Sequence, residues 1–310
     1  MPQSYSPLIT IGIPTYNRAN SYLGQTLHSA LGQTYENIEI IVSDNCSQDN
    51  TEELVRGFSD PRIRYIRQSE NIGSNNNFNV CIAQAKGDFC LLLPDDDLID
   101  GDFIESCVKA SAETPEVGII RTGTRLINSD GTTYYEQQNP AAGLTTTDFF
   151  LAWFDNKITF YVCSTLFNRK RLQEIGGIKS RHNLFQDVIA EFKLAARYGR
   201  VDIMDVKASF RRHEENIGSA AKISAWCEDS LELLDVMCSL IPANSSLIRD
   251  KGMDYFCKKM YVYTSKLQSP FERLITYYNI YKMFEYRHSP LRFIYSKKIK
   301  YYIERLRASN

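Results

Sequence analysis

The chain has 310 residues, which is enough for one large domain or for one domain with an extension. Its hydrophobic content of 43%, charged content of 24% and net charge of −1 are ordinary for a globular protein and give no general signal for binding nucleic acid. The eight cysteines are scattered without a CxxC pair, which favours reduced core residues of a cytosolic protein over a disulfide framework or a zinc site. No segment approaches the roughly 18 apolar residues of a membrane span, and the N-terminus lacks the pattern of a signal peptide.

The first hundred residues alternate between short apolar runs and helical segments. The apolar runs predict strands at 8–13, 38–42, 63–67 and 89–93. The segments between them predict helices at 21–33, 51–58 and 75–85, and Asp49 is placed to cap the second one. This alternation predicts βαβ units and a mostly parallel sheet with right-handed crossovers. Neither GxGxxG nor GxxxxGK[ST] is present, which counts against a dinucleotide dehydrogenase and a P-loop NTPase.

The pattern changes after residue 112. Apolar runs predict further strands at 117–122, 125–128, 160–167 and 201–210. Helical periodicity of the apolar residues, with glycines just after the second and third segments, predicts helices at 146–154, 169–175 and 186–198. From about residue 220 only helical periodicity remains. We therefore expect an α/β domain over 1–218, with halves at 1–100 and 101–218, followed by a helical extension over 219–310.

The end of the chain is basic. Residues 270–310 contain nine Lys or Arg and three Glu, an excess of six positive charges, with tyrosines interleaved. A basic, Tyr-rich amphipathic segment can make a peripheral contact with an anionic membrane, or it can pack on the main domain through its Tyr and Ile faces. The sequence leaves both interpretations open.

Three consecutive acids follow the apolar run at 89–93, and we call Asp95, Asp96 and Asp97 the aspartate triplet. Adjacent carboxylates repel one another and lose hydration when buried, and a divalent cation removes that penalty. Mg²⁺ and Mn²⁺ take such oxygen ligands and share them with substrate phosphates. The alternative is a solvated acidic turn that caps the helix after Leu98.

Polar clusters also follow the earlier strands. Thr15 to Arg18 follow the first strand, and Asp44 and Asn45 follow the second. The carboxyl ends of parallel strands lie at one edge of a sheet, where open α/β sheets bind ligands. We therefore expect these clusters and the aspartate triplet to meet there.

Four stretches together resemble glycosyltransferase family 2, the inverting sugar-nucleotide enzymes of the GT-A fold. They are IGIPTYNR at 11–18, EIIVSDNCSQD at 39–49, NIG at 71–73, and AKGD at 85–88 running into the aspartate triplet. They match in order and spacing, and the resemblance covers roughly 6–218. It implies a GT-A, Rossmann-like fold: a mixed, mostly parallel sheet flanked by helices, with the helical extension behind it.

The resemblance implies a nucleotide site on the first two loops. Pro14, Thr15 and Tyr16 would cradle the base and ribose, and Asp44, with Asn45 beside it, would bind the base edge. A ring N–H needs a fixed acceptor, which Asp44 supplies, although an Asp after a strand is also a common turn former. Arg18 would approach the phosphates, or form a surface salt bridge.

The resemblance also implies a Mn²⁺ or Mg²⁺ site. Asp97 would bind the metal, Asp95 would lie nearer the ribose, and Asp96 would also contact the nucleotide. His213 matches a family position that contacts metal or diphosphate, although a lone His is often structural. Arg212 offers planar donors for the diphosphate.

The family's mechanism requires a base at the start of a later helix. Inversion is an in-line displacement by an acceptor hydroxyl, and a carboxylate opposite the diphosphate must accept the proton. Asp187 matches this position, and Gln186 departs from the usual Glu. An Asp at a helix N-terminus is also a common stabilising residue.

The implied activity is metal-dependent transfer from a nucleoside-diphosphate sugar to a hydroxyl of a glycan or polyprenyl-linked acceptor during cell-surface polysaccharide synthesis. A UDP-sugar is the usual donor, but the SNNNFN stretch at 74–79 resembles O-antigen abequosyl- and rhamnosyltransferases and weakens that assumption. The expected location is the cytoplasm, including the inner face of the cell membrane, and nucleic acid is not an expected partner. A nucleotidyltransferase and a non-catalytic sugar-nucleotide-binding module remain the alternatives.

Overall fold

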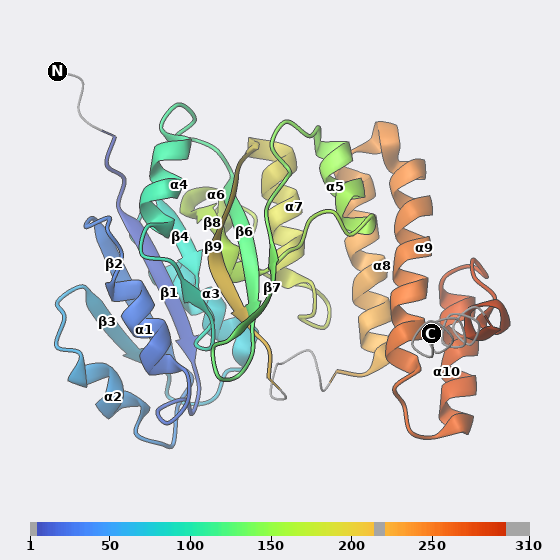
Figure 1. Ribbon diagram of the computed structural model, residues 1–310, viewed down its shortest axis with the longest axis horizontal. Coiled ribbons are helices and arrows are strands. Elements are labelled where there is room, and N and C mark those ends of the chain that lie inside the picture. The colour runs from blue at the N-terminus through green and yellow to red at the C-terminus, as the bar shows by residue number, and fades with distance from the viewer. Residues whose placement is uncertain (1–4, 214–220, 296–310) are drawn as a thin grey trace, which may run out of the picture. The chain divides into compact units, whose positions relative to one another are not determined.

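The computed structural model describes residues 5–213 and 221–295 (Figure 1). Its contacts divide the chain into two compact units. The sheet unit comprises Met1–Lys179 and Gln186–Asn216, and the helical unit comprises Ser180–Phe185 and Ile217–Asn310.

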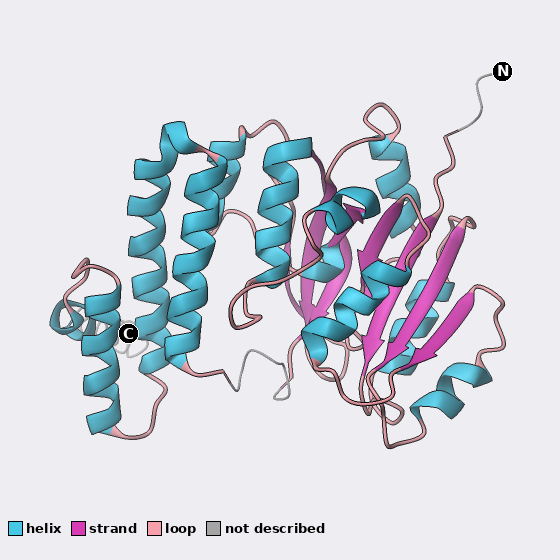
Figure 2. Cartoon of the chain, turned by 180° about the vertical axis from the view of Figure 1, so that it is seen from behind, coloured by secondary structure: helices cyan, strands magenta, loops and turns pink. Residues whose placement is uncertain are grey.

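The first half of the sheet unit is parallel, as the sequence predicts. Strands β1 (Ile9–Thr15), β2 (Ile38–Asp44), β3 (Ile63–Arg67) and β4 (Phe89–Leu92) lie in the order β3-β2-β1-β4. Between them lie helices α1 (Leu23–Leu31), α2 (Thr51–Gly57) and α3 (Ser74–Gln84). Figure 1 shows α1 in front of the strands, whereas the reverse view in Figure 2 shows α3 in front, so helices cover both faces.

The core of this half is built on β1, in which every residue is buried. Such a strand is typical of a parallel sheet covered on both faces. Gly12 lets α3 approach closely, because a Cβ at this position would lie 2.7 Å from Cβ of Cys81. The eight cysteines are free thiols, in agreement with the sequence expectation.

The second half adds strands of mixed direction. They are β5 (Leu98–Ile99), β6 (Ile119–Ile127), β7 (Thr133–Gln137), β8 (Thr165–Asn168) and β9 (Arg200–Arg211). Strand β8 is antiparallel to β4, the order continues β8-β6-β9-β5, and β7 pairs with β6. The accompanying helices are α4 (Phe103–Ser111), α5 (Thr146–Phe154), α6 (Arg169–Glu174) and α7 (Gln186–Tyr198).

Three local predictions need correction. The two strands predicted at 117–122 and 125–128 are one strand, β6 (Ile119–Ile127), because pairing with β9 continues through a shift of register near Gly123. The strand predicted at 160–167 begins only at Thr165, because Ser164 N–H donates to Tyr161 O in a 3₁₀ turn, Val162–Ser164. Strand β7 was not predicted, since its residues are mostly exposed and show no buried alternation.

The helical unit contains α8 (Ile223–Leu240), the 3₁₀ turn Pro242–Asn244, α9 (Ser245–Thr264) and α10 (Pro270–Met283). The fully buried Asp229 of α8 accepts hydrogen bonds from Ser180 Oγ (2.6 Å) and from the N–H groups of His182 (2.7 Å) and Leu184 (2.9 Å). These bonds hold the segment 180–185 within the helical unit.

Within the described residues, no single helix has the length and apolar composition to cross a membrane. The consecutive segments Ile223–Leu240 and Pro242–Thr264, bent by 117°, meet that criterion only when taken together.

Candidate functional site

The loops that follow β1 and β2 are tied together by hydrogen bonds. Asn17 N–H donates to Ser47 Oγ (2.8 Å), and Gln48 N–H donates to Asn17 Oδ1 (2.7 Å). Asn17 has a left-handed φ of 54°, which Asn tolerates better than most residues. This conformation leaves the Tyr16 side chain exposed beside the strand ends.

Asp44 is buried at the end of β2 and strongly hydrogen bonded. Ser47 donates to its Oδ1 through N–H (2.9 Å) and Oγ–H (2.5 Å), and Tyr65 Oη donates to its Oδ2 (2.5 Å). Arg67 Nε lies 4.0 Å from the same Oδ2. The protein therefore fixes both carboxylate oxygens, as a base-binding acceptor requires, although each oxygen already has a protein partner.

Asn45 and Asn77 join a third loop to these two strand ends. The amide oxygen of Asn45 accepts from Ile72 N–H, and its Nδ2 donates to Asn71 Oδ1, both at 2.8 Å. Asn77 Nδ2 donates to the carbonyls of Ser43 (2.7 Å) and Thr15 (3.4 Å). The Asn-rich start of α3 thus fixes the edge of the sheet, which gives Asn77 a structural role.

The aspartate triplet begins next to the first loop. Arg18 Nε lies 3.8 Å from Asp95 Oδ1, so Arg18 reaches the triplet and not a distant surface acid. Burial raises the pKa of Asp95 to about 7, and the neighbouring charge of Asp96 adds to this effect. A cation at this position would favour the ionised form.

Asp96 lies against His213. His213 Nε2 is 2.7 Å from Asp96 Oδ2, and the His213 ring centroid lies 5.2 Å from that of Tyr22. Both side chains of the Asp96–His213 pair are largely buried. The predicted closeness of His213 to the triplet is therefore present.

Asp97 is fully buried, and only one of its oxygens has a hydrogen-bond partner. Its Oδ1 accepts from the Arg211 N–H at 2.8 Å, whereas its buried Oδ2 has no partner with full hydrogen-bond geometry, and the Cys163 thiol, a weak donor, lies beside this carboxylate. Burial, with a contribution from Asp96, raises the pKa of Asp97 well above its usual value. An unsatisfied carboxylate oxygen is costly in a protein interior unless a ligand or ion compensates it.

Arg211 holds the triplet from the end of β9. Its guanidinium donates to Asp96 O and Gln25 Oε1, both at 2.8 Å, and its Cζ lies 4.5 Å from the Tyr22 ring centroid. Further bonds reach the carbonyls of the turn after β6. Sequence reasoning singled out its neighbour Arg212 and missed this buried residue.

The donors in this region fit a hard divalent cation. Among the described residues, no three His, Cys, Asp or Glu side chains form a group that could hold a metal ion alone. Mg²⁺ and Mn²⁺ sites often use only one or two carboxylates together with substrate phosphates, so such a group is not required. The uncompensated Oδ2 of Asp97 and the neighbouring Asp96 carboxylate supply oxygen donors of the right kind, and His213 lies beside them.

Asp187 lies in the first turn of α7, in surroundings that differ from those of the aspartate triplet. Burial raises its pKa, and its Oδ1 accepts a 2.9 Å hydrogen bond from Val188 N–H. One turn later, fully buried Glu191 accepts from Arg121 Nε at 3.0 Å. Burial raises the pKa of Glu191 to about 8, and the negative charge of Asp187 contributes to this rise.

The structure thus brings most of the predicted residues into one connected set. Contacts link the loop of Thr15 and Arg18 to Asp44 and Asn45, and link Arg18, through the triplet, to His213. The described hydrogen bonds and ion pairs of Asp187 do not reach the triplet. Glu191 was also missed, although an acid between Val188 and Ala195 on the apolar face of α7 is a recognisable signal.

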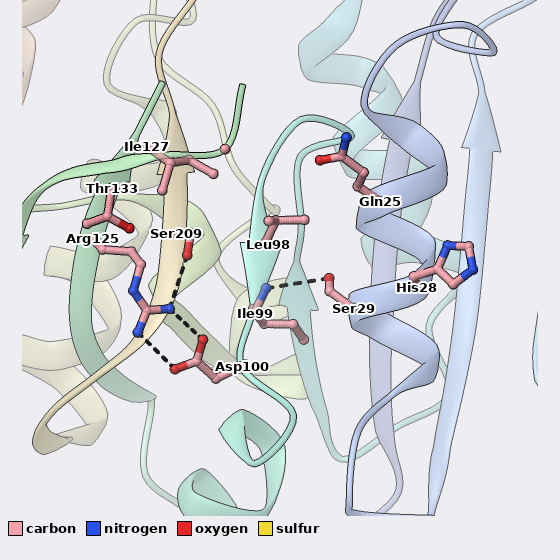
Figure 3. A pocket seen from close by; sticks show the side chains of 11 residues that line it. Gln25, His28, Ser29, Leu98, Ile99, Asp100, Arg125, Ile127, Thr133 and Ser209 are labelled. Carbon is pink, nitrogen blue, oxygen red and sulfur yellow. Dashed lines mark hydrogen bonds and ion pairs between the residues drawn. The ribbon is translucent and has the colours of Figure 1, made fainter. Parts of the chain in front are cut away.

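A cavity of about 620 Å³ lies between α1 and the strands β5, β6 and β9 (Figure 3). Arg125 lines it and forms an ion pair with Asp100 (2.5 Å) and a hydrogen bond with Ser209 Oγ (3.2 Å). Gln25, which accepts from Arg211, forms part of the same wall. The cavity is therefore connected to the triplet through Gln25 and Arg211.

Comparison with known families agrees with this geometry. The model of "Glycosyl transferase family 2" matches residues 10–176. Abequosyltransferase RfbV of Salmonella typhimurium is 33% identical over 160 residues, which cover 49% of this chain and 45% of that protein. Chondroitin synthase of Pasteurella multocida is 34% identical over 127 residues, 40% of this chain and 13% of that protein. The matched regions thus span half or less of these relatives.

Solved structures show the same fold. S. aureus TarS 1–349, in complex with UDP-GlcNAc, aligns over 90% of this chain and 89% of its own, with a TM-score of 0.61 and 14% identity. The mannosyltransferase PcManGT from Pyrobaculum calidifontis, in complex with GDP-Man and Mn²⁺, aligns over 92% and 86%, with a TM-score of 0.56 and 18% identity. With a GT-A fold and a family match over more than half of its length, this chain belongs to glycosyl transferase family 2.

Proposed function

We propose that this enzyme transfers a sugar from a nucleoside-diphosphate sugar, most simply a UDP-sugar, to a hydroxyl group of a glycan or polyprenyl-linked acceptor. The transfer proceeds with inversion, depends on Mn²⁺ or Mg²⁺, and serves the synthesis of cell-surface polysaccharide. The observation that carries the proposal is the buried Asp97 Oδ2, which lacks a hydrogen-bond partner at the carboxyl end of the central strands. Structural neighbours in complex with UDP-GlcNAc and with GDP-Man and Mn²⁺ support this type of donor.

The donor half of the site would bind the nucleotide and its diphosphate. Asp44 would accept a hydrogen bond from the base, since its buried oxygens are held in fixed positions. Pro14, Thr15 and Tyr16 would contact the base and ribose, and Arg18 would reach the diphosphate beside Asp95. Asp97 and His213, with Asp96, would hold the cation, which offsets the negative charge that develops on the leaving diphosphate.

The acceptor half of the site would remove a proton. In the reaction, the acceptor oxygen forms a bond to the anomeric carbon while the bond from that carbon to the diphosphate oxygen breaks. The acceptor hydroxyl proton passes to the Asp187 carboxylate. Burial raises the pKa of Asp187 towards neutral pH, and a general base is most effective when its pKa lies near the operating pH.

The test is release of nucleoside diphosphate from a panel of UDP-, GDP-, CDP- and dTDP-sugars, with Mn²⁺, with Mg²⁺ and with a chelator. We expect one donor class to be used, and chelation to stop its use. The anomeric configuration of the product, read by NMR, reports inversion directly. Undiminished turnover under chelation, or a product with retained configuration, would overturn the corresponding part of the proposal.

A further inference from the structure

Helix α10 carries a row of large apolar side chains on its outer face. Phe271, Leu274, Ile275 and Tyr278 are exposed by 74%, 62%, 45% and 59%. Their spacing of three, one and three residues places them along one side of the helix. We call these four residues the apolar row.

The opposite side of α10 already provides its packing surface. Tyr277 and Ile280 are buried, and the Tyr277 ring centroid lies 5.3 Å from that of Tyr261 on α9. The helix is therefore apolar on two sides, of which only one packs against residues of the helical unit that the structure describes. Single exposed apolar residues are common on protein surfaces, but a contiguous row of this kind usually marks an interaction site.

Basic side chains are exposed on this part of the helical unit, together with the acids Glu272 and Glu285. Lys282 is exposed one turn beyond Tyr278, on the same side of the helix. Arg292 is exposed between Leu291 and Tyr295, which are themselves 77% and 67% exposed. On α9, Asp250 forms an ion pair with Arg287, and Asp254 forms one with Lys258, so these acids are offset by basic partners.

We propose that the apolar row, together with the basic residues Lys282 and Arg292, forms a docking surface for an anionic lipid bilayer. The apolar side chains would enter the boundary between headgroups and acyl chains, and the Lys and Arg side chains would contact anionic headgroups. Tyr278 and Tyr295 suit this boundary, since each has an apolar ring and a polar hydroxyl. Membrane binding of this kind is peripheral, and it requires neither the donor nor the metal of the proposed reaction.

The test is sedimentation of the full chain with vesicles of phosphatidylglycerol and phosphatidylcholine, and with vesicles of phosphatidylcholine alone. The test variant combines Phe271→Ser, Leu274→Ser and Tyr278→Ser. The matched control combines Tyr134→Ser, Tyr135→Ser and Met204→Ser, which remove three exposed apolar side chains from the sheet unit. A second variant, Lys282→Glu with Arg292→Glu, changes charge alone.

We expect the wild type and the matched control to bind anionic vesicles, and the apolar-row variant to bind at least about tenfold more weakly. The charge variant should lose binding to anionic vesicles, and higher salt should weaken wild-type binding. Circular dichroism and release of nucleoside diphosphate should be unchanged in both variants. The proposal fails if the wild type does not sediment with anionic vesicles or if the apolar-row variant binds as well as the wild type. It also fails if that variant only converts a dimer into a monomer, since a second copy of the chain would then cover the row.

Discussion

The aspartate triplet and the first turn of α7 carry the acids of the proposed reaction, and the protein holds them differently. Arg211 fixes the triplet through the backbone of Asp96 and the carboxylate of Asp97. Among the described hydrogen bonds, Asp187 accepts only one, from the N–H of the next residue. The segment 180–185 that precedes α7 is held by Asp229. Changes at the triplet should therefore affect ligand binding and local structure, whereas changes at Asp187 should affect proton transfer alone.

Asp97→Ala tests the triplet side and should have the largest effect. Removal of the uncompensated oxygen should lower metal-dependent transfer at least about 10³-fold, because a metal contributes several kcal/mol of charge stabilisation. The measurement is nucleoside diphosphate release at saturating Mn²⁺. Asp205→Ala, which removes an exposed aspartate of β9, is the control and should retain wild-type turnover.

Asp187→Asn tests the other side of the comparison. Loss of a general base should lower transfer by roughly 10²- to 10⁴-fold. Donor affinity, measured by calorimetry with Mn²⁺, should remain at the wild-type value. Equal loss of donor binding in Asp187→Asn and Asp97→Ala would contradict the division of roles.

Arg211→Met tests whether the triplet depends on its buried support. The substitution leaves several partly buried acceptors without their charged donor, and should lower the free energy of unfolding by about 3 kcal/mol. Urea denaturation measures this change. Arg212→Met, at the exposed neighbouring position, should cost less than about 1 kcal/mol, and equal losses would show that Arg211 has no special structural role.

Glu191→Gln tests how the α7 side responds to pH. Burial raises the pKa of Glu191 to about 8 from a usual value of 4.5, so the folded state holds this proton more tightly than the unfolded state does. Its contribution to stability is therefore fully present below about pH 4.5 and is lost as pH rises towards 8. Urea denaturation at a series of pH values measures the free energy of unfolding. Between pH 4.5 and 8 this free energy should fall less steeply in Glu191→Gln than in the wild type. The same dependence on pH in both proteins would contradict the raised pKa of Glu191.

The grouping of polar residues at the strand ends was predictable from sequence because local rules determine it. Each parallel strand ends in polar residues, and parallel strands place their ends at one edge, so Asp44, Asp97 and the first loop could be grouped in advance. Arg211 and Glu191 could not be assigned so directly. Arg211 and Arg212 are identical neighbours, and which one is buried depends on how β9 pairs with β6, a contact between distant parts of the chain.

The most direct test is calorimetric titration of the preferred nucleoside diphosphate into the wild type, Asp97→Ala and Asp187→Asn, each with and without Mn²⁺. We expect Mn²⁺ to strengthen nucleotide binding in the wild type and in Asp187→Asn, and to have no effect in Asp97→Ala. A Mn²⁺ effect of wild-type size in Asp97→Ala would show that the cation and diphosphate do not bind at the aspartate triplet.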